Sequence, residues 1–159
     1  MNATRLKLMV VIGSLLLFTS CQQSLTMWVV AGSSANNLVF GWSTSRDSDE
    51  KIQPEEIRVF ACDTIGRQNG GGYYPDTHSA VWAASSPSDA LPAPTNRVTY
   101  GKGLSQSSVK PLNVPGCYVV IGYAREGNGY TEVATMGFKI AADGTATDMP
   151  RSEYENLFR

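Results

Sequence analysis

Residues that favour β-strands dominate most of the chain after its first 25 residues. Between Glu56 and Cys62 they alternate, with Ile57, Val59 and Ala61 on one side of the strand and the residues between them on the other. A period of two residues predicts a strand with one face buried. Segments rich in Val, Ile, Tyr, Phe and Trp are predicted as strands at residues 26–30, 37–42, 56–62, 79–83, 97–100, 117–124 and 130–140.

The segments between these strands have the composition of turns and surface loops. Gly127-Asn128-Gly129 predicts a hairpin turn, because Asn and Gly tolerate a positive φ. Asp143-Gly144 predicts a second turn, after which residues 145–149 extend or cap the sheet. About seven short strands with such connections favour an all-β fold, an antiparallel β-sandwich. The last residues, 152–159, form either a short helix or a frayed tail.

The first 20 residues have the layout of a secretory signal. Arg5 and Lys7 precede an apolar run, and small residues follow it directly before Cys21. The run is too short to span a bilayer as a helix, which takes about 20 residues. A secretory signal is therefore favoured over a transmembrane anchor.

Phe18-Thr19-Ser20-Cys21 resembles the lipobox of bacterial lipoproteins, with Phe18 in place of the usual leucine. The resemblance implies that Cys21 is lipidated and becomes the first residue after cleavage. More than one acyl chain gives stable anchoring, at about 0.8 kcal/mol for each buried methylene. The alternative to lipidation is an ordinary signal peptide with an incidental cysteine near its cleavage site.

The residue after the cysteine bears on the location of the lipidated protein. In lipoproteins of enterobacteria, an aspartate directly after the lipidated cysteine often marks retention in the inner membrane. This chain has Gln22 at that position, so the resemblance implies sorting to the outer membrane. The implied location is the cell envelope, on the periplasmic side or at the cell surface.

These features divide the chain into four parts. Residues 1–20 are the predicted signal peptide, 21–27 the lipidated N-terminus with a short tether, 28–149 the β-sandwich, and 150–159 the tail or helix. Once the basic residues of the signal are removed, acidic residues are in excess and no run of Lys or Arg is present. A nucleic-acid partner therefore has no electrostatic support.

Two cysteines, Cys62 and Cys117, are left when Cys21 carries lipid. In an oxidising compartment two thiols of a small domain usually pair. The bond would close a loop of about 55 residues and contribute about 4 kcal/mol on the chain-entropy model. A metal site or a catalytic thiol would need histidine partners, and His78 is the single histidine.

The segment LNVPGCYVVIGYA resembles the tyrosine-corner segment of fibronectin type III and related immunoglobulin-like domains through Leu112, Gly116 and Tyr118. The resemblance implies an immunoglobulin-like sandwich in which the Tyr118 ring lies at the edge of the core and its hydroxyl bonds the backbone. Residues 38–42, with Phe40 and Trp42, are similar to an early strand of that family. Because residues 62–110 depart from the pattern, a transthyretin-like or another sandwich is also open.

In the predicted sandwich, each of these two cysteines lies at one end of a strand. Cys62 ends one predicted strand and Cys117 begins another, and in such sandwiches these two strands can be neighbours in one sheet. The disulfide would then join adjacent strands.

Several groups of polar residues are weak candidates for catalysis or metal binding. Neighbours in an extended Asp76-Thr77-His78-Ser79 point to opposite faces, so they do not form a triad. The acids within residues 47–50 are interpreted as a solvated loop and not as a calcium site. Glu55 and Glu56 are interpreted as a solvated strand entry and not as a glycosidase pair. No catalytic constellation and no cofactor are expected.

A candidate binding surface is formed by Tyr73, Tyr74, His78 and Trp82, next to a glycine-rich loop. Exposed aromatic side chains suit the recognition of a sugar or a protein. The alternative is that one ring of each pair packs inward and the other covers the sheet edge.

The sequence thus predicts a non-catalytic binding or structural module, held at the membrane by lipid and contacting an envelope protein or a glycan. An alternative is an inhibitor of a hydrolase such as lysozyme, with residues 70–74 inserting into the enzyme cleft. A hydrolytic enzyme is the third hypothesis.

Overall fold

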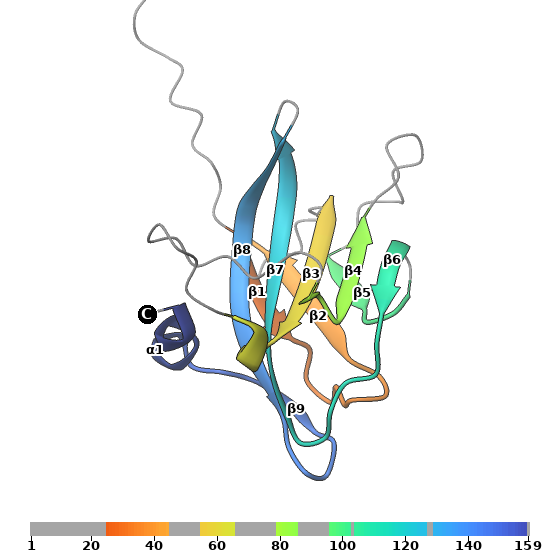
Figure 1. The fold of residues 1–159 in the computed structure, drawn as a ribbon, viewed down its shortest axis with the longest axis vertical. Coiled ribbons are helices and arrows are strands. Elements are labelled where there is room, and N and C mark those ends of the chain that lie inside the picture. Colours follow the sequence, from red (N-terminus) through yellow and green to blue (C-terminus); the bar gives the residue numbers. More distant parts are fainter. Residues whose placement is uncertain are drawn as a thin grey trace, which may run out of the picture.

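The computed structural model describes residues 25–44, 55–65, 79–85, 96–102, 104–126 and 129–158. In this part of the chain, two antiparallel sheets pack against each other, as Figure 1 shows. The smaller sheet has the order β1-β2-β5, and the larger has the order β6-β4-β3-β7-β8-β9. The prediction of an all-β antiparallel sandwich is confirmed.

The strands of each sheet are short except for one long hairpin. The smaller sheet contains β1 (Thr26–Val29), β2 (Val39–Ser43) and β5 (Arg97–Thr99). The larger sheet contains β3 (Glu56–Ala61), β4 (Trp82–Ser85), β6 (Ser105–Val109), β7 (Gly116–Glu126), β8 (Gly129–Ile140) and β9 (Ala146–Asp148). Strands β1, β2 and β5 match A, B and E of an immunoglobulin-like sandwich in order, and β3, β7 and β8 match C, F and G.

The described part has nine strands where about seven were expected. Strand β9 lies within the predicted extension at residues 145–149, whereas β6, with the sequence SQSSV, was not predicted. The sandwich also begins earlier than residue 28, because β1 begins at Thr26 and Met27 is buried in the core. The sandwich therefore begins inside the segment assigned to the tether.

Strands β7 and β8 pair as far as Glu126 and Gly129, the residues on either side of the first predicted turn, whose residues 127 and 128 lie outside the described residues. At the second turn, Gly144 has a φ of 85° and the Thr145 N–H donates to Asp143 Oδ1 at 2.8 Å. Only glycine adopts this φ without steric cost, which explains the Asp-Gly pair.

Large side chains from both sheets fill the space between them. Phe40 of β2 meets Phe138 of β8 edge to face, with 5.4 Å between ring centroids. Tyr118 of β7 stacks on Phe138 at 5.2 Å. These are the separations at which aromatic pairs attract one another, and they join the smaller sheet to the centre of the larger one.

The central strands of the larger sheet are buried on their outer face as well. Phe60 of β3 and Val119 and Ile121 of β7 alternate away from the main core, yet each is at most 2% exposed. They form a second apolar cluster against which Leu157 and Phe158 pack. The C-terminal residues therefore cover part of this face.

Two charged residues lie beside this second cluster. Glu56 is only 8% exposed and is ion-paired with Arg58, whose guanidinium lies 5.1 Å from the Tyr123 ring centroid. The prediction of a solvated strand entry at Glu56 is therefore wrong. The strands on either side of β3 bury the Glu56 carboxylate, and Arg58 is its ion-pair partner.

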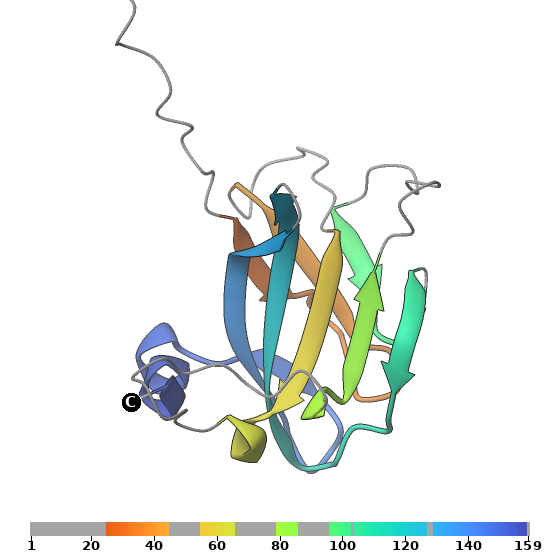
Figure 2. The same cartoon turned by 45° about the horizontal axis from the view of Figure 1, so that its top comes forward.

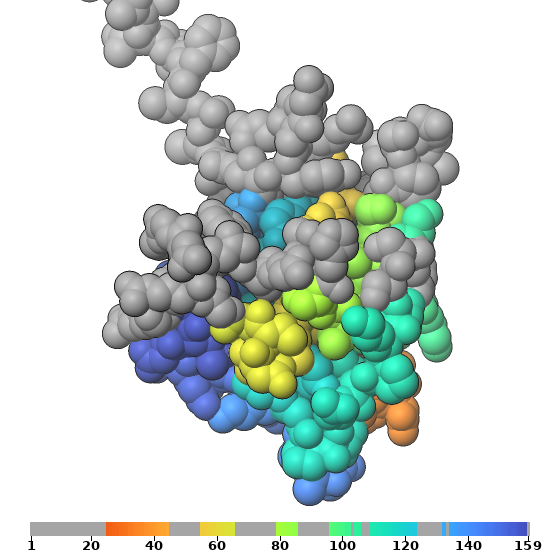
Figure 3. Space-filling model, viewed as in Figure 1, coloured from red at the N-terminus to blue at the C-terminus, as the bar shows by residue number. Residues whose placement is uncertain are grey.

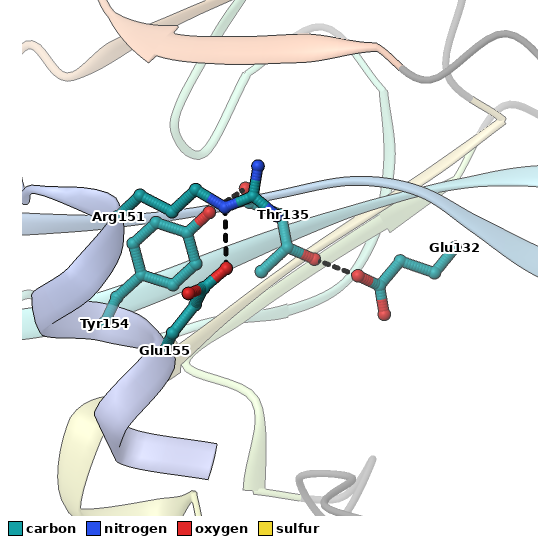
Figure 4. Close-up of polar contacts among 5 residues, drawn as sticks. All are labelled: Glu132, Thr135, Arg151, Tyr154 and Glu155. Carbon is teal, nitrogen blue, oxygen red and sulfur yellow. Dashed lines mark hydrogen bonds and ion pairs between the residues drawn. The ribbon is translucent and has the colours of Figure 1, made fainter. Parts of the chain in front are cut away.

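The C-terminal segment is helical, which resolves the choice between a helix and a frayed tail. It consists of α1 (Arg151–Tyr154) and the 3-10 turn η3 (Glu155–Phe158). The Met149 N–H donates to the Gly137 carbonyl at 2.8 Å, and the Tyr154 hydroxyl donates to the Thr135 carbonyl at 3.2 Å. Figure 4 shows Tyr154 directed at Thr135, with Arg151 paired to Glu155 beside it. These bonds use backbone carbonyls of β8 beyond Phe138, where the pairing with β9 ends.

Gly137 permits this close packing. A Cβ at this position would lie 2.6 Å from Tyr154 Cβ and 3.1 Å from Met149 Cβ. Backbone and Cβ atoms of a packed segment cannot move aside cheaply, so the C-terminal helix fits against β8 only because residue 137 has no side chain.

We predict that Gly137→Ala lowers the free energy of unfolding by about 1–3 kcal/mol, the usual cost of overpacking. Urea denaturation followed by tryptophan fluorescence measures this change. Gly122→Ala in β7 is the matched control, since its new Cβ would meet its nearest neighbour, Met27 Sδ, at 3.5 Å. Equal stabilities of the two variants would contradict the close contact at Gly137.

Candidate contact surface at one end of the sandwich

The predicted aromatic binding surface is corrected by the position of Trp82. Its side chain is fully buried, 6.3 Å from Phe40 and 5.1 Å from Tyr100 between ring centroids. The pleat of β4 turns Trp82 toward the core and Ala83 toward the outer face, so Trp82 is a core residue. Tyr73, Tyr74 and His78 lie outside the described residues, as do Cys21 and residues 70–74 of the inhibitor hypothesis.

The predicted disulfide between Cys62 and Cys117 is present, with 5.4 Å between the Cα atoms. Ala61 of β3 pairs with Tyr118 of β7, so the bond lies at the next position of the same ladder. It therefore joins adjacent strands of one sheet, as the sandwich architecture implied. It also fixes the first residues of β7, where the chain leaves the connection from β6.

Of the three residues of the predicted tyrosine corner, Leu112 lies in this connection, and Gly116 and Tyr118 lie at the start of β7. Tyr118 is buried, and its hydroxyl accepts the Asn113 N–H and lies 3.4 Å from the Asn113 carbonyl oxygen. Leu112 is half-buried against the main core. A Cβ at Gly116 would lie 2.5 Å from the Asn113 carbonyl oxygen. Glycine at 116 thus lets the Asn113 backbone reach the phenol.

A second tyrosine holds the other end of the same connection, and the sequence indicated no role for it beyond that of a strand residue. The Tyr100 hydroxyl donates to the Lys110 carbonyl at 2.7 Å, and the Val81 carbonyl lies 3.2 Å from the same oxygen. In the sequence, the one indication of a role for Tyr100 was its position at the end of the predicted strand RVTY. Its acceptors are distant in sequence, so the bond itself could not be predicted.

Both phenols are neutral at neutral pH, as a tyrosine with the ordinary pKa of 10 would be. Desolvation raises the pKa of Tyr100 and that of Tyr118 above this value, so they also stay neutral in mildly alkaline solution. Each hydroxyl therefore holds the backbone by hydrogen bonds alone.

We call residues 110–115 the pinned loop, because a buried tyrosine hydroxyl holds its backbone at Lys110 and again at Asn113. The side chains of the pinned loop are exposed apart from Leu112. Val114 is 46% exposed, and Val109, directly before the loop, is 50% exposed. These two valines are the exposed large apolar residues of the described part of the chain. Figure 3 shows the teal atoms of this connection protruding at the lower end of the molecule.

Val109 lies beside the turn after β5, since a Cβ at Gly101 would be 3.5 Å from Val109 Cγ1. Val109 pairs with Trp82 of β4, so its side chain lies on the same face of the sheet as Trp82. Lys102, in that turn, and Lys110, directly after Val109, both have exposed side chains.

The pinned loop and the start of the folded chain lie at opposite ends of the sandwich. In Figures 1 and 2, β1 begins at the end of the sandwich where β7 ends and β8 begins, and the connection from β6 to β7 turns at the other end. The pairing of Thr26 with Ser43, the last residue of β2, agrees with this arrangement.

The described residues offer no group of three or more His, Cys, Asp or Glu side chains placed to bind a metal ion. Within the same ranges, no helix has the length and apolar character needed to cross a membrane. Comparison of the chain with protein-family models, with curated proteins and with solved structures gives no match.

We predict that Tyr118→Phe and Tyr100→Phe each lower the free energy of unfolding by about 1 kcal/mol, the net value of one hydrogen bond. Amide hydrogen exchange separates the two effects. The Asn113 amide loses protection in Tyr118→Phe, whose phenol it bonds, and keeps it in Tyr100→Phe. Unchanged protection of Asn113 in both variants would show that the hydroxyl does not hold the loop.

Proposed function

We propose that the chain is a lipid-anchored protein of the bacterial cell envelope whose sandwich is a non-catalytic binding or structural module. Cleavage before Cys21 and acylation of that cysteine hold the domain at a membrane, and sorting places it at the outer membrane. Its partner is an envelope protein or glycan, and it uses no cofactor.

The observation that carries this proposal is the start of the fold directly after the lipobox-like segment. Strand β1 begins at Thr26, and Met27 already packs in the main core. A chain cut before Cys21 would therefore keep every strand of the sandwich. With so few residues between Cys21 and β1, the domain would lie close to the bilayer.

Two further features support the proposal. The Cys62–Cys117 disulfide suits an oxidising compartment outside the cytoplasm. The pinned loop suits binding, because a loop that is ordered before contact loses less conformational entropy when a partner binds. Surface loops held by a rigid scaffold are also where binding residues are commonly found.

We predict that the chain, expressed in a bacterial host and labelled with an alkyne analogue of palmitate, carries the label on an N-terminus that begins at Cys21. Mass spectrometry of the purified protein locates both the cleavage site and the acyl groups. Cys21→Ser is the control, and it removes the label together with membrane association. An unlabelled protein that is cleaved elsewhere, or that retains residues 1–20, would contradict the proposal.

A further inference from the structure

We propose that the outward face of the smaller sheet, with Trp28 at its centre and Arg97 beside it, binds an acidic glycan. The class of ligand is a chain of pyranose rings that carries carboxylate or phosphate groups. This inference rests on the proposed function, because it selects the glycan from the two kinds of envelope partner named there. It is carried by the register of the sheet, by the orientation of the Trp28 ring, and by the charge and size of the face.

The register of the smaller sheet places these residues on one face. Gly41 of β2 pairs with Trp28 of β1 on one side and with Arg97 of β5 on the other, so the three form one cross-strand row. Directly paired residues project from the same face of a sheet. The paired residues of the next row, Phe40 and Val98, are buried in the main core. Successive residues of a strand alternate between faces, so the row with Trp28 faces outward.

The Trp28 ring lies flat on this face, over Gly41. A Cβ at Gly41 would lie 2.6 Å from Nε1 and 2.7 Å from Cζ2 of the ring, and closer still to Cε2, which is bonded to both. An atom that met the edge of the ring here would be nearer to the two outer atoms than to Cε2, so Gly41 lies beneath the ring face. Because Trp28 is half-buried and the sheet covers one face of its ring, the opposite face is the one that meets solvent.

A flat, partly exposed indole suits a sugar ring. The face of an aromatic ring carries partial negative charge, and the C–H groups on one face of a pyranose carry partial positive charge. The sugar can stack on the indole while its hydroxyl groups reach polar side chains around it. Thr26 and Thr99 supply hydroxyl groups on the same face, since they pair with the outward Ser43 and Val39. A few polar groups placed around an apolar surface are what fixes the orientation of a small ligand.

Charge determines which glycan fits. Arg97 is exposed, and a guanidinium has five N–H donors, so it can bind a ligand in addition to a protein partner. Its planar fork matches a carboxylate or a phosphate. The outward positions of the three strands hold no carboxylate, and they are Thr26, Trp28, Val39, Gly41, Ser43, Arg97 and Thr99. The face therefore favours a glycan with anionic groups over a neutral one.

The size of the face favours a glycan over a folded protein. Three strands, of which the longest has five residues, give a face about 14 Å wide and about 16 Å long, or about 230 Å². A stable protein interface buries about 800 Å² on each partner. The helices of the described part pack against the larger sheet, as Figure 2 shows, and leave this face to a ligand.

The orientation of the ring also argues against the bilayer as the occupant. Tryptophans that anchor a protein at a membrane interface reach into the headgroup region, whereas the Trp28 ring lies against the sheet backbone at Gly41. Strand β1 begins close to Cys21, and the sheet extends from there along the side of the domain. A glycan chain can therefore reach the face from the aqueous compartment.

The experiment begins with the fluorescence of Trp28. The chain has three tryptophans, and Trp42 and Trp82 are at most 2% exposed, so acrylamide should quench Trp28 most strongly. The full chain, purified from its host in detergent, is compared with Trp28→Phe. We expect the readily quenched part of the emission to be absent from the variant. Equal quenching in the two proteins would overturn the proposal, because the ring would then have no face open to a ligand.

Two acidic glycans are then titrated against the same protein. They are uncrosslinked peptidoglycan strands, which carry carboxylates, and lipopolysaccharide core oligosaccharide, which also carries phosphates. We expect one or both to protect Trp28 from acrylamide, which identifies the source of the glycan, and a neutral N-acetylglucosamine tetramer to bind at least tenfold more weakly. Protection by neither acidic glycan, or equal binding of the neutral tetramer, would overturn the proposal.

A membrane arm tests the alternative occupant. The chain is reconstituted in vesicles of phosphatidylethanolamine and phosphatidylglycerol, with no glycan present. We expect acrylamide to quench Trp28 as it does in detergent. A Trp28 that the vesicles alone protect would assign this face to the bilayer and overturn the proposal.

Calorimetry with the glycan that binds measures the contribution of each side chain. We expect Trp28→Ala and Arg97→Gln each to weaken binding at least tenfold, and Arg97→Lys, which keeps the charge, to weaken it less than Arg97→Gln. Arg151→Gln is the matched control, since this exposed arginine of α1 lies beside the larger sheet, and it should leave binding within twofold. Unaltered urea midpoints show that the variants fold. Wild-type affinity in Trp28→Ala or in Arg97→Gln would overturn the proposal.

The titrations separate this proposal from the proposed function. Binding of a glycan in solution does not depend on acylation of Cys21, which the palmitate experiment tests independently. A chain that is acylated but binds neither acidic glycan keeps its anchor and loses this site. A chain that is not acylated but loses glycan binding in Trp28→Ala keeps the site and loses the anchor.

Discussion

The pairing of β3 with β7 is the constraint on which the rest of the structure depends. From Glu56 opposite Tyr123 to Ala61 opposite Tyr118, the two strands form a continuous antiparallel ladder. The Cys62–Cys117 disulfide lies at the end of that ladder. Both faces of the pair are buried, the inner face in the main core and the outer face in the second cluster with Leu157 and Phe158. A one-residue shift in register would turn every one of these side chains to the wrong face.

The same ladder determines the geometry of the candidate surface. Because Tyr118 is placed by β7, its hydroxyl is fixed in space and the Asn113 backbone is bound at a set position. Tyr100, directly after β5, contacts Trp82 of the larger sheet and holds the Lys110 carbonyl. The pinned loop is therefore held by residues of both sheets. Its order depends on the packing of the sandwich, and its exposed side chains are free to serve recognition.

The sequence predicts features that depend on local pattern. The alternation in β3 and the Asp143-Gly144 turn depend on a few neighbouring residues. The pairing of Cys62 with Cys117 follows from the number of cysteines that remain after Cys21. Strand β6 escaped prediction because SQSSV has no apolar alternation, and its pairing with β4 comes from tertiary structure. Trp82 was misplaced because Val81, Trp82 and the alanines that follow show no alternation, so the sequence cannot indicate which one faces the core.

Long-range contacts account for the other differences. Glu56 is buried because β3 lies between β4 and β7, and the role of Tyr100 depends on a carbonyl ten residues later in the chain. Neither contact can be deduced from the residues next to it in sequence. For Cys21, Tyr73, Tyr74 and His78, which lie outside the described residues, the sequence predictions stay predictions.

The most direct test of the central constraint is urea unfolding of the purified protein with the disulfide intact and after reduction and alkylation. The bond spans 55 residues, for which the chain-entropy model gives about 4 kcal/mol. We expect the oxidised form to be more stable by about this amount, with a single cooperative transition. Equal stability of the two forms, or two thiols that react with an alkylating agent before any reductant is added, would contradict the account.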